Sequence, residues 1–204
     1  SIQKLEEINV RESFRLINLA NNAGVKRLIA AGTCLEYGEE ANKWQTIPPN
    51  ASLKPLCPYS KSKAKSFKLL HDFASKNKIQ LFYGRIFSAY GDGQYKDNFW
   101  PSLKSAAIKG NDFSMTNGEQ IRDFIKIESV VQHLVNAIYR KDILIGKPLV
   151  LNIGSGFGQS LKEFAFKEWE TFGAKGELLP GKLKGRSYEI KRMVANIKNL
   201  NLVT

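Results

Sequence analysis

Apolar side chains recur alternately at helical and at strand-like spacing along the first half of the chain. Residues 1–22 place them roughly one turn apart, which predicts a helix ended by the polar run before Gly24. The segment 26–31, which is apolar from Leu28 onward, predicts a short buried strand that runs into Gly32-Thr33. After a polar, proline-rich loop, the same succession returns as a helix over 59–76 and a buried strand over 79–87. Helices that alternate with buried strands are typical of a parallel sheet with covering helices.

The elements that the pattern predicts become shorter after Tyr90. They are helices over 99–109 and 130–140, short strands over 113–115 and 123–125 around Asn117-Gly118, and a strand over 149–153. Ser160 with Glu163 is a capping box that opens a further helix. We therefore expect two parts. Residues 1–90 would build the main sheet, and residues 91–204 a smaller α/β region interleaved with it.

Charge and composition narrow the class of partner. The 204 residues include 31 Lys and Arg against 19 Asp and Glu, a formal net charge of +12. This balance favours nucleic acid, an anionic membrane surface or a phosphorylated small molecule. No apolar run approaches the roughly 18 residues that span a bilayer, and the polar first residues show no signal peptide. Because Cys34 and Cys57 are too few for a disulfide framework, we expect a cytoplasmic protein with no membrane segment.

The strongest chemical signal is a tyrosine and a lysine four positions apart in the predicted helix over 59–76. Tyr59 and Lys63 would share one face of that helix, one turn apart. A nearby ammonium favours the phenolate, so Lys63 is expected to lower the pKa of Tyr59 and let it exchange a proton with a hydroxyl or carbonyl. Thr33 follows the preceding strand, where parallel sheets place ligand-binding groups, and its hydroxyl could orient a substrate oxygen.

Further motifs surround these residues in a fixed order. They are Asn9-Val10 with Leu16-Ile17, Gly24 to Ile29, Gly32-Thr33-Cys34-Leu35-Glu36-Tyr37-Gly38, Pro58 to Lys63, Arg85-Ile86-Phe87-Ser88-Ala89-Tyr90-Gly91, Arg122-Asp123-Phe124-Ile125, and Asn152 to Gly156. In this order the chain resembles the extended short-chain dehydrogenases/reductases of the nucleotide-sugar epimerase and dehydratase type. The resemblance covers nearly the whole chain, and several motifs in succession are more specific than any single one.

The resemblance implies a fold and a reaction. The fold is a Rossmann-like, doubly wound parallel sheet whose first βαβ units are missing here, followed by a small C-terminal α/β part, residues 91–204, that binds substrate. The reaction is hydride transfer between a nucleotide-diphosphate sugar and NAD or NADP. Tyr59 would be the acid/base, Lys63 would lower its pKa and bind the nicotinamide ribose, and Thr33 would hydrogen-bond the reacting hydroxyl. Phe87 and Gly32 would join Tyr59 and Lys63 in binding the cofactor.

The substrate, by the same resemblance, would contact Thr33, Cys34, Ser88 and Arg122. Arg122 corresponds to an arginine on the substrate diphosphate, a role that suits a bidentate guanidinium. The plainer alternative for Arg122 is a surface ion pair with Asp123. Ser88 stands where the family usually has Asn and is shorter, with no amide group.

Two departures from the family pattern restrict these implications. The glycine-rich dinucleotide fingerprint is absent, because the run Gly154-Ser155-Gly156-Phe157-Gly158 would need a further glycine at Gln159. The chain is therefore expected to be incomplete at both ends, and the choice between NAD and NADP stays open. Cys34 and Leu35 stand where the dehydratase branch carries an Asp and a Glu, so epimerisation or keto-reduction is favoured over dehydration.

The expected function is thus an NAD(P)-dependent epimerase or keto-reductase. The alternative is a non-catalytic protein of the same fold that binds RNA or another polyanion, which the +12 charge favours and the threonine, tyrosine and lysine set does not. Family members often form homodimers through the helices that carry Asn9 and Tyr59. On that basis Phe14, Phe67 and Phe73 are candidates for a partly intersubunit position. No metal site is expected.

Overall fold

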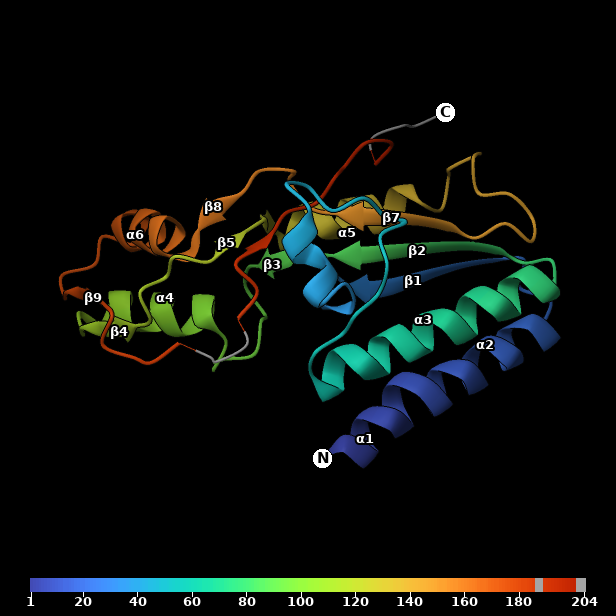
Figure 1. Cartoon of the computed structure of the whole chain (residues 1–204), viewed down its shortest axis with the longest axis horizontal. Coiled ribbons are helices and arrows are strands. Elements are labelled where there is room, and N and C mark those ends of the chain that lie inside the picture. The colour runs from blue at the N-terminus through green and yellow to red at the C-terminus, as the bar shows by residue number, and fades with distance from the viewer. Residues whose placement is uncertain (186–188, 201–204) are drawn as a thin grey trace.

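The computed structural model describes residues 1–185 and 189–200. A three-stranded parallel sheet lies at its centre, with the strands in the order β1-β2-β7 (Figure 1). The strands are β1 (Arg27–Thr33), β2 (Gln80–Ile86) and β7 (Leu149–Ile153). Thr33 pairs in register with Ile86, and Ile86 with Ile153. The carboxyl ends of all three strands therefore meet at one edge of the sheet.

Helices cover both faces of this sheet (Figure 1). Ile17, Leu70 and Tyr83 belong to the apolar cluster on one face, and Phe82 and Val130 to the cluster on the other. The helices on the first face are α1 (Ile2–Glu6), the π-helical segment Glu7–Glu12, α2 (Ser13–Asn22) and α3 (Pro58–Lys76), and α5 (Ile127–Asn136) lies on the second. None of the helices in the described part of the chain is long and apolar enough to cross a membrane.

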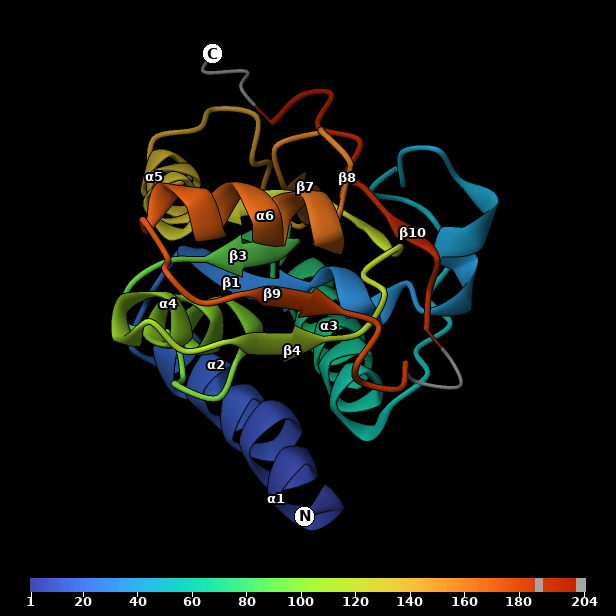
Figure 2. The ribbon, with the colours of Figure 1, turned by 90° about the vertical axis from the view of Figure 1, so that its left-hand side faces the viewer.

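Short strand pairs and two helices form the rest of the chain, on the left in Figure 1 and towards the viewer in Figure 2. The strands are β3 (Ser88–Tyr90) beside β6 (Phe124–Lys126), β4 (Phe113–Met115) beside β9 (Leu178–Pro180), and β5 (Ile121–Arg122) between β8 (Gln159–Ser160) and β10 (Arg192–Met193). The helices α4 (Phe99–Lys109) and α6 (Leu161–Thr171) enclose an apolar cluster around Leu103 and Trp169. We call this region, residues 88–126 and 159–193 where described, the short-strand region. Two 3-10 turns, Cys34–Glu36 and Glu39–Lys43, follow β1.

Several predicted elements are confirmed and others are shifted. The helix over 99–109 and the strand over 149–153 lie where predicted, and Ser160 does cap α6 with Glu163. The predicted helix over 130–140 instead begins at Ile127 and ends at Asn136. The first helix contains a π-helical segment that apolar spacing does not indicate.

The two short strands around Asn117-Gly118 do not pair with each other. Residues 113–115 pair with β9 and residues 124–126 with β3. Asp123 lies between β5 and β6, and its carboxylate accepts hydrogen bonds from neighbouring loops. Strands of two or three residues take their partners from distant parts of the chain, which local spacing does not specify.

Phe14, Phe67 and Phe73 pack within the chain. The rings of Phe14 and Phe73 meet edge to face with centroids 5.6 Å apart, and Phe67 lies 4.7 Å from the ring of Tyr83. All three are partly buried against the cluster between α2, α3 and the sheet. The apolar side chains that these first helices do expose are Ile2, Ile8, Leu16 and Leu19.

Candidate functional site

Thr33 ends β1 and at the same time caps the following turn. Its hydroxyl oxygen accepts a hydrogen bond from the N–H of Leu35 at 3.3 Å, and its own N–H donates to Glu36 Oε1 at 2.9 Å. This reciprocal pair is a capping box, which satisfies two backbone donors at the start of the turn. The position of the Thr33 hydroxyl is therefore fixed by local sequence.

Tyr59 and Lys63 enter the site from α3. Pro58 is at the first position of this helix, which proline favours because its missing N–H has no partner there. One turn after Tyr59, Lys63 Nζ donates a hydrogen bond to the carbonyl oxygen of Ala31 at 2.8 Å. The Thr33 side chain lies close enough to Tyr59 to act on the pKa of the phenol. The predicted tyrosine, lysine and threonine thus come together at the carboxyl end of β1, with Tyr59 40% exposed.

Asn9 supports this arrangement from the π-helical segment. Its Nδ2 donates to Ser62 Oγ at 2.9 Å, and Ser62 Oγ donates to the carbonyl oxygen of Tyr59 at 2.8 Å. A π-helical turn inserts an extra residue into the helical repeat, so it redirects a side chain. Asn9 therefore ties the first turn of α3 to the N-terminal helix.

The electrostatics of Tyr59 differ from the expectation. Burial raises the pKa of Tyr59, the negative charge of Glu36 adds to the rise, and the nearby Thr33 side chain acts in the opposite direction. Burial lowers the pKa of Lys63. The predicted lowering of the Tyr59 pKa by Lys63 is thus not found, because burial and Glu36 dominate and Lys63 Nζ points to the Ala31 carbonyl. Tyr59 is consequently a neutral phenol and a hydrogen-bond donor near pH 7.

Three other residues predicted for the site are buried. Cys34 is 5% exposed, and burial raises the pKa of its thiol to about 12. Phe87 is 3% exposed and packs beside Tyr37. Gly32 lies under the ring of Tyr83, where a Cβ would stand 2.2 Å from a ring carbon. The side chains of Cys34 and Phe87 are therefore packed inside the protein and do not open into the site, and Gly32 has no side chain to contribute.

A pocket of about 310 Å³ opens in the short-strand region. Arg122 and Ser88 both line it, whereas Thr33 and Cys34, which were predicted to contact the substrate with them, do not. Aromatic rings make up much of the remaining wall, together with three amide side chains. They are Tyr90, Phe99, Trp100, Phe124 and Phe164, with Gln94, Asn98 and Gln120. An apolar wall with a few polar groups is typical of small-molecule sites.

Arg122 does not pair with Asp123. Its Nη2 lies 3.6 Å from Glu189 Oε1, and its Nη1 donates to the carbonyl oxygen of Ile121 at 2.8 Å. Burial lowers the pKa of Arg122, whereas Glu189 raises it. The carboxylate of Asp123 is fully buried and accepts hydrogen bonds from the N–H groups of Ser155, Gly156 and Ala195. Arg122 therefore keeps donors for a ligand while Asp123 anchors the strand beside it.

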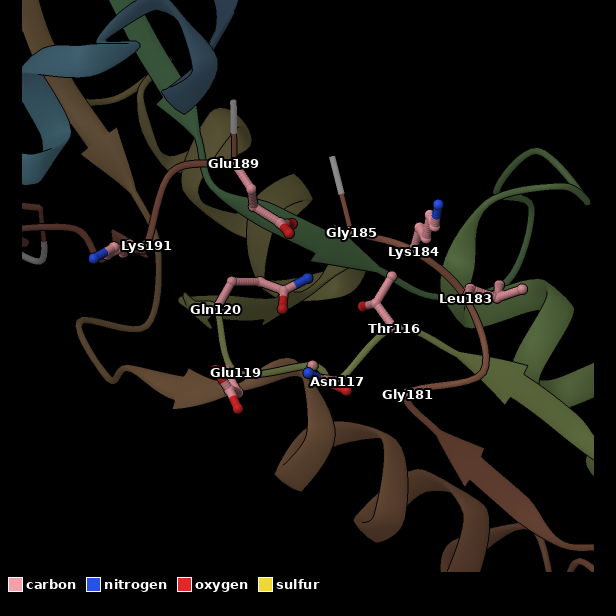
Figure 3. A pocket seen from close by; sticks show the side chains of 11 residues that line it. Thr116, Asn117, Glu119, Gln120, Gly181, Leu183, Lys184, Gly185, Glu189 and Lys191 are labelled. Atoms are coloured by element: carbon pink, nitrogen blue, oxygen red, sulfur yellow. The ribbon is translucent and has the colours of Figure 1, made fainter. Parts of the chain in front are cut away.

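A larger pocket of about 620 Å³ adjoins this one through Gln120. Figure 3 shows Gln120, Thr116 and Glu189 reaching into it from opposite sides, with Lys184 and Lys191 at its margin. Sequence reasoning missed Glu189 and Gln120, since no local motif marks either one. Glu189 and Gln120 come together because β5, which directly follows Gln120, pairs with β10, which comes shortly after Glu189. No group of three potential metal ligands occurs among the residues described.

Comparisons with known proteins identify the family and the fold of the chain. The profile of the NAD dependent epimerase/dehydratase family matches residues 1–154. The CDP-abequose synthase of Salmonella typhimurium is 31% identical over 204 residues, which is 98% of this chain and 64% of that protein. The probable UDP-arabinose 4-epimerase 3 of Oryza sativa is 28% identical over 163 residues, 69% of this chain and 39% of that protein.

Solved structures show the same fold. MoeE5 in complex with UDP-glucuronic acid and NAD superposes with a TM-score of 0.83 at 27% identity, covering 96% of this chain and 64% of that one. A UDP-N-acetylglucosamine 4-epimerase from Methanobrevibacter ruminantium gives a TM-score of 0.86 at 21% identity, covering 97% and 63%. The chain spans about 40% of the length of the first curated relatives it matches. By the extent of the family match, the chain belongs to the NAD-dependent epimerase/dehydratase family, with a Rossmann-like fold.

Proposed function

We propose that the complete protein is an NAD(P)-dependent epimerase or keto-reductase that acts on a nucleotide-diphosphate sugar. The observation that carries the proposal is the convergence of Thr33, Tyr59 and Lys63 at the carboxyl end of β1. Arg122 lines a pocket there together with Leu35, which follows β1, and Ser60, next to Tyr59. Relatives named as UDP-sugar epimerases and as CDP-abequose synthase support it. The polyanion-binding alternative gains nothing from these relatives.

The donor set at Lys63 fits a nicotinamide cofactor. An ammonium has three donors, and among the described residues only the carbonyl of Ala31 accepts one of them. The remaining donors suit the hydroxyl groups of a ribose. Tyr59 and Lys63 would hold the nicotinamide ribose, while Phe87 and Gly32 shape the floor beneath it. When bound, this cofactor supplies the acceptor or donor of the hydride.

The protein's own residues move the proton. Tyr59, a neutral phenol here, donates its proton to the oxygen of a keto sugar in the reductive direction and recovers it from the hydroxyl in the reverse direction. Thr33 donates a hydrogen bond to the same oxygen and keeps it within reach of Tyr59. The raised pKa of Tyr59 favours the donor role.

The short-strand region binds the rest of the substrate. Arg122, with unused donors beside an apolar pocket, would pair with the diphosphate. Ser88 lines the same pocket, and Cys34 would reach the substrate only through its backbone. Since neither Cys34 nor Leu35 carries a carboxyl group, dehydration is disfavoured.

The proposal also includes the oligomeric state and the cellular location of the complete protein. The exposed Ile8, Leu16 and Leu19 on the first helices favour a homodimer that covers them. We also place the protein in the cytoplasm. Sedimentation that gives only a monomer would contradict the dimer.

The direct test is turnover of a panel of UDP-, dTDP- and CDP-sugars by the complete protein. Tyr59→Phe is expected to fold normally and to lose about 10²–10⁴-fold in turnover, because it removes the phenolic proton donor. Tyr139→Phe, which alters an exposed tyrosine, is the matched control and should match the wild type. Unchanged turnover of Tyr59→Phe would remove the proposed mechanism.

A further inference from the structure

A buried ion pair, Glu36 with Arg85, lies beneath the candidate catalytic residues. Both residues belong to family motifs, but the resemblance to the family gives neither of them a role. Glu36 and Arg85 are 0% and 2% exposed, and Arg85 Nε donates to Glu36 Oε2 at 2.8 Å. The other carboxylate oxygen of Glu36 accepts hydrogen bonds from the Tyr83 hydroxyl at 2.8 Å and from the N–H of Thr33 at 2.9 Å. Three hydrogen bonds thus join the Glu36 carboxylate to β1 and β2.

The same pair contacts α3. The guanidinium of Arg85 lies over the ring of Phe67 at 4.3 Å, and Phe67 also packs on Tyr83. Phe67 is one helical turn beyond Lys63 and two turns beyond Tyr59, so it lies near the face of α3 that carries both. The Arg85–Phe67 contact therefore sets the rotation of α3 about its axis.

Gly32 allows this arrangement to form. The ring of Tyr83 occupies the space that a side chain at Gly32 would need, and this brings the Tyr83 hydroxyl under the end of β1. On its far side, Arg85 Nη1 donates to the carbonyl oxygen of Pro49 at 2.8 Å and to the Tyr37 hydroxyl at 3.3 Å. That hydroxyl in turn donates to Asn152 Oδ1 on β7 at 2.6 Å. The Glu36–Arg85 pair thus connects the turn after β1 with β2, β7 and α3.

We propose that Glu36 is a positioning residue, which holds the Thr33 hydroxyl against Tyr59 by joining the backbone of Thr33 to α3 through Arg85. The inference rests on the proposed function for its catalytic consequence. A buried ion pair by itself is weak evidence for stability, because well-packed apolar residues often replace one without loss. Replacing both Glu36 and Arg85 by apolar residues can therefore keep the fold while it removes the hydrogen bond to Thr33. A loss of turnover in such a variant indicates a positioning role and not a purely structural one.

The test uses the double variant Glu36→Leu/Arg85→Met in the complete protein. Its apolar side chains keep the core filled, whereas either single variant would leave one buried charge unpaired and could prevent folding. If Glu36 positions Thr33, the folded double variant loses about 10²-fold in turnover, as misplacement of a reacting group by about 1 Å does. KM for the nucleotide sugar stays near the wild-type value, because Arg122 is untouched.

A second readout does not depend on activity. The Thr33 N–H, now bonded to Glu36 Oε1, should lose protection against hydrogen exchange in the double variant while amides in the middle of β2 keep theirs. Glu36→Gln/Arg85→Met, which leaves no buried charge unpaired and keeps the Oε1 acceptor of the Thr33 N–H and the Tyr83 hydroxyl, should keep most of both readouts. Glu40→Gln is the matched control, since Glu40 is 6% exposed and pairs with Lys43 and Lys54 away from Thr33.

Three outcomes would overturn the inference. They are wild-type turnover in a folded double variant, an effect on KM alone, and unchanged exchange at Thr33. If Tyr59→Phe keeps full turnover, the proposed function fails, and exchange at Thr33 still decides whether Glu36 holds this residue in place.

Discussion

The parallel sheet and the short-strand region build their sites in different ways. Thr33, Tyr59 and Lys63 belong to a seven-residue strand and a 19-residue helix that pack on each other along their length. Arg122 belongs to the two-residue strand β5, and Glu189 comes shortly before the two-residue strand β10, which pairs with β5 across some 70 positions of the sequence. The first site rests on regular, buried elements, and the second on many single contacts.

This difference suggests a division of roles, in which one region holds the reacting groups and the other binds the rest of the substrate. Proton transfer requires groups held within a fraction of an ångström, which long packed elements provide. A pocket bounded by short strands and loops tolerates changes in its lining without disturbing those elements. We therefore propose that the sheet carries out the reaction and that the short-strand region sets the substrate preference.

The largest effect that should separate the two regions is on stability. Asp123→Ala removes the acceptor of three backbone N–H groups and of the Ser155 hydroxyl, and we expect a loss of about 3 kcal/mol in the free energy of unfolding. Urea unfolding measures it. Asp112→Ala, which removes an exposed acceptor for the N–H of Glu177, should cost less than about 1.5 kcal/mol. Equal losses for the two would show that Asp123 does not anchor the short-strand region.

The next effect concerns the sheet site alone. Lys63→Met keeps the length of the side chain but removes the ammonium that bonds to Ala31. We expect turnover to fall about 10²-fold, at the lower end of losses in acid/base sites, and dinucleotide affinity to fall with it. Lys65→Met, which removes an exposed lysine on the same helix, serves as control in the same kinetic and calorimetric assays. A loss of turnover without any change in dinucleotide affinity would contradict the ribose role.

The smallest effect is a pH dependence set by Tyr59. Because burial and Glu36 raise its pKa, the phenol stays protonated above the ordinary value of about 10. The reductive rate should therefore stay level from neutral pH and decline only in strong alkali, and the oxidative rate should rise with pH over the same range. Initial rates in both directions measure this. An inflection near pH 7 that Tyr59→Phe abolishes would mean that the phenolate dominates in the working enzyme.

The sequence predicted the sheet far better than the short-strand region. The apolar run before Gly32 and the four-residue spacing of Tyr59 and Lys63 report local geometry, so β1, α3 and the meeting of Thr33 with Tyr59 were predictable. The sequence marks Glu36 only as one residue of a motif and indicates no role for it. Its role depends on Arg85, 49 positions away, and no local signal carries that pairing.

Two features of the site lay beyond local reasoning for physical reasons. The direction of the Tyr59 pKa depends on burial and on Glu36, neither of which residue spacing reveals. The partner of Arg122 is Glu189 and not the adjacent Asp123, because Asp123 turns its carboxylate to the N–H groups of Ser155, Gly156 and Ala195. Glu189 reaches Arg122 only through the pairing of β5 with β10, two short strands that lie far apart in the sequence.

The central claim, that the sheet performs the reaction and the short-strand region binds the substrate, is tested most directly by one paired measurement. Nucleotide-sugar affinity by calorimetry and turnover of the bound substrate are measured for Tyr59→Phe and Arg122→Ala in the complete protein. We predict that Tyr59→Phe keeps the wild-type affinity and loses turnover. Arg122→Ala should bind about 10- to 100-fold more weakly, as loss of a charged hydrogen bond does, and still turn over what it binds. The reverse pattern, or the same loss of affinity in both variants, would contradict the account.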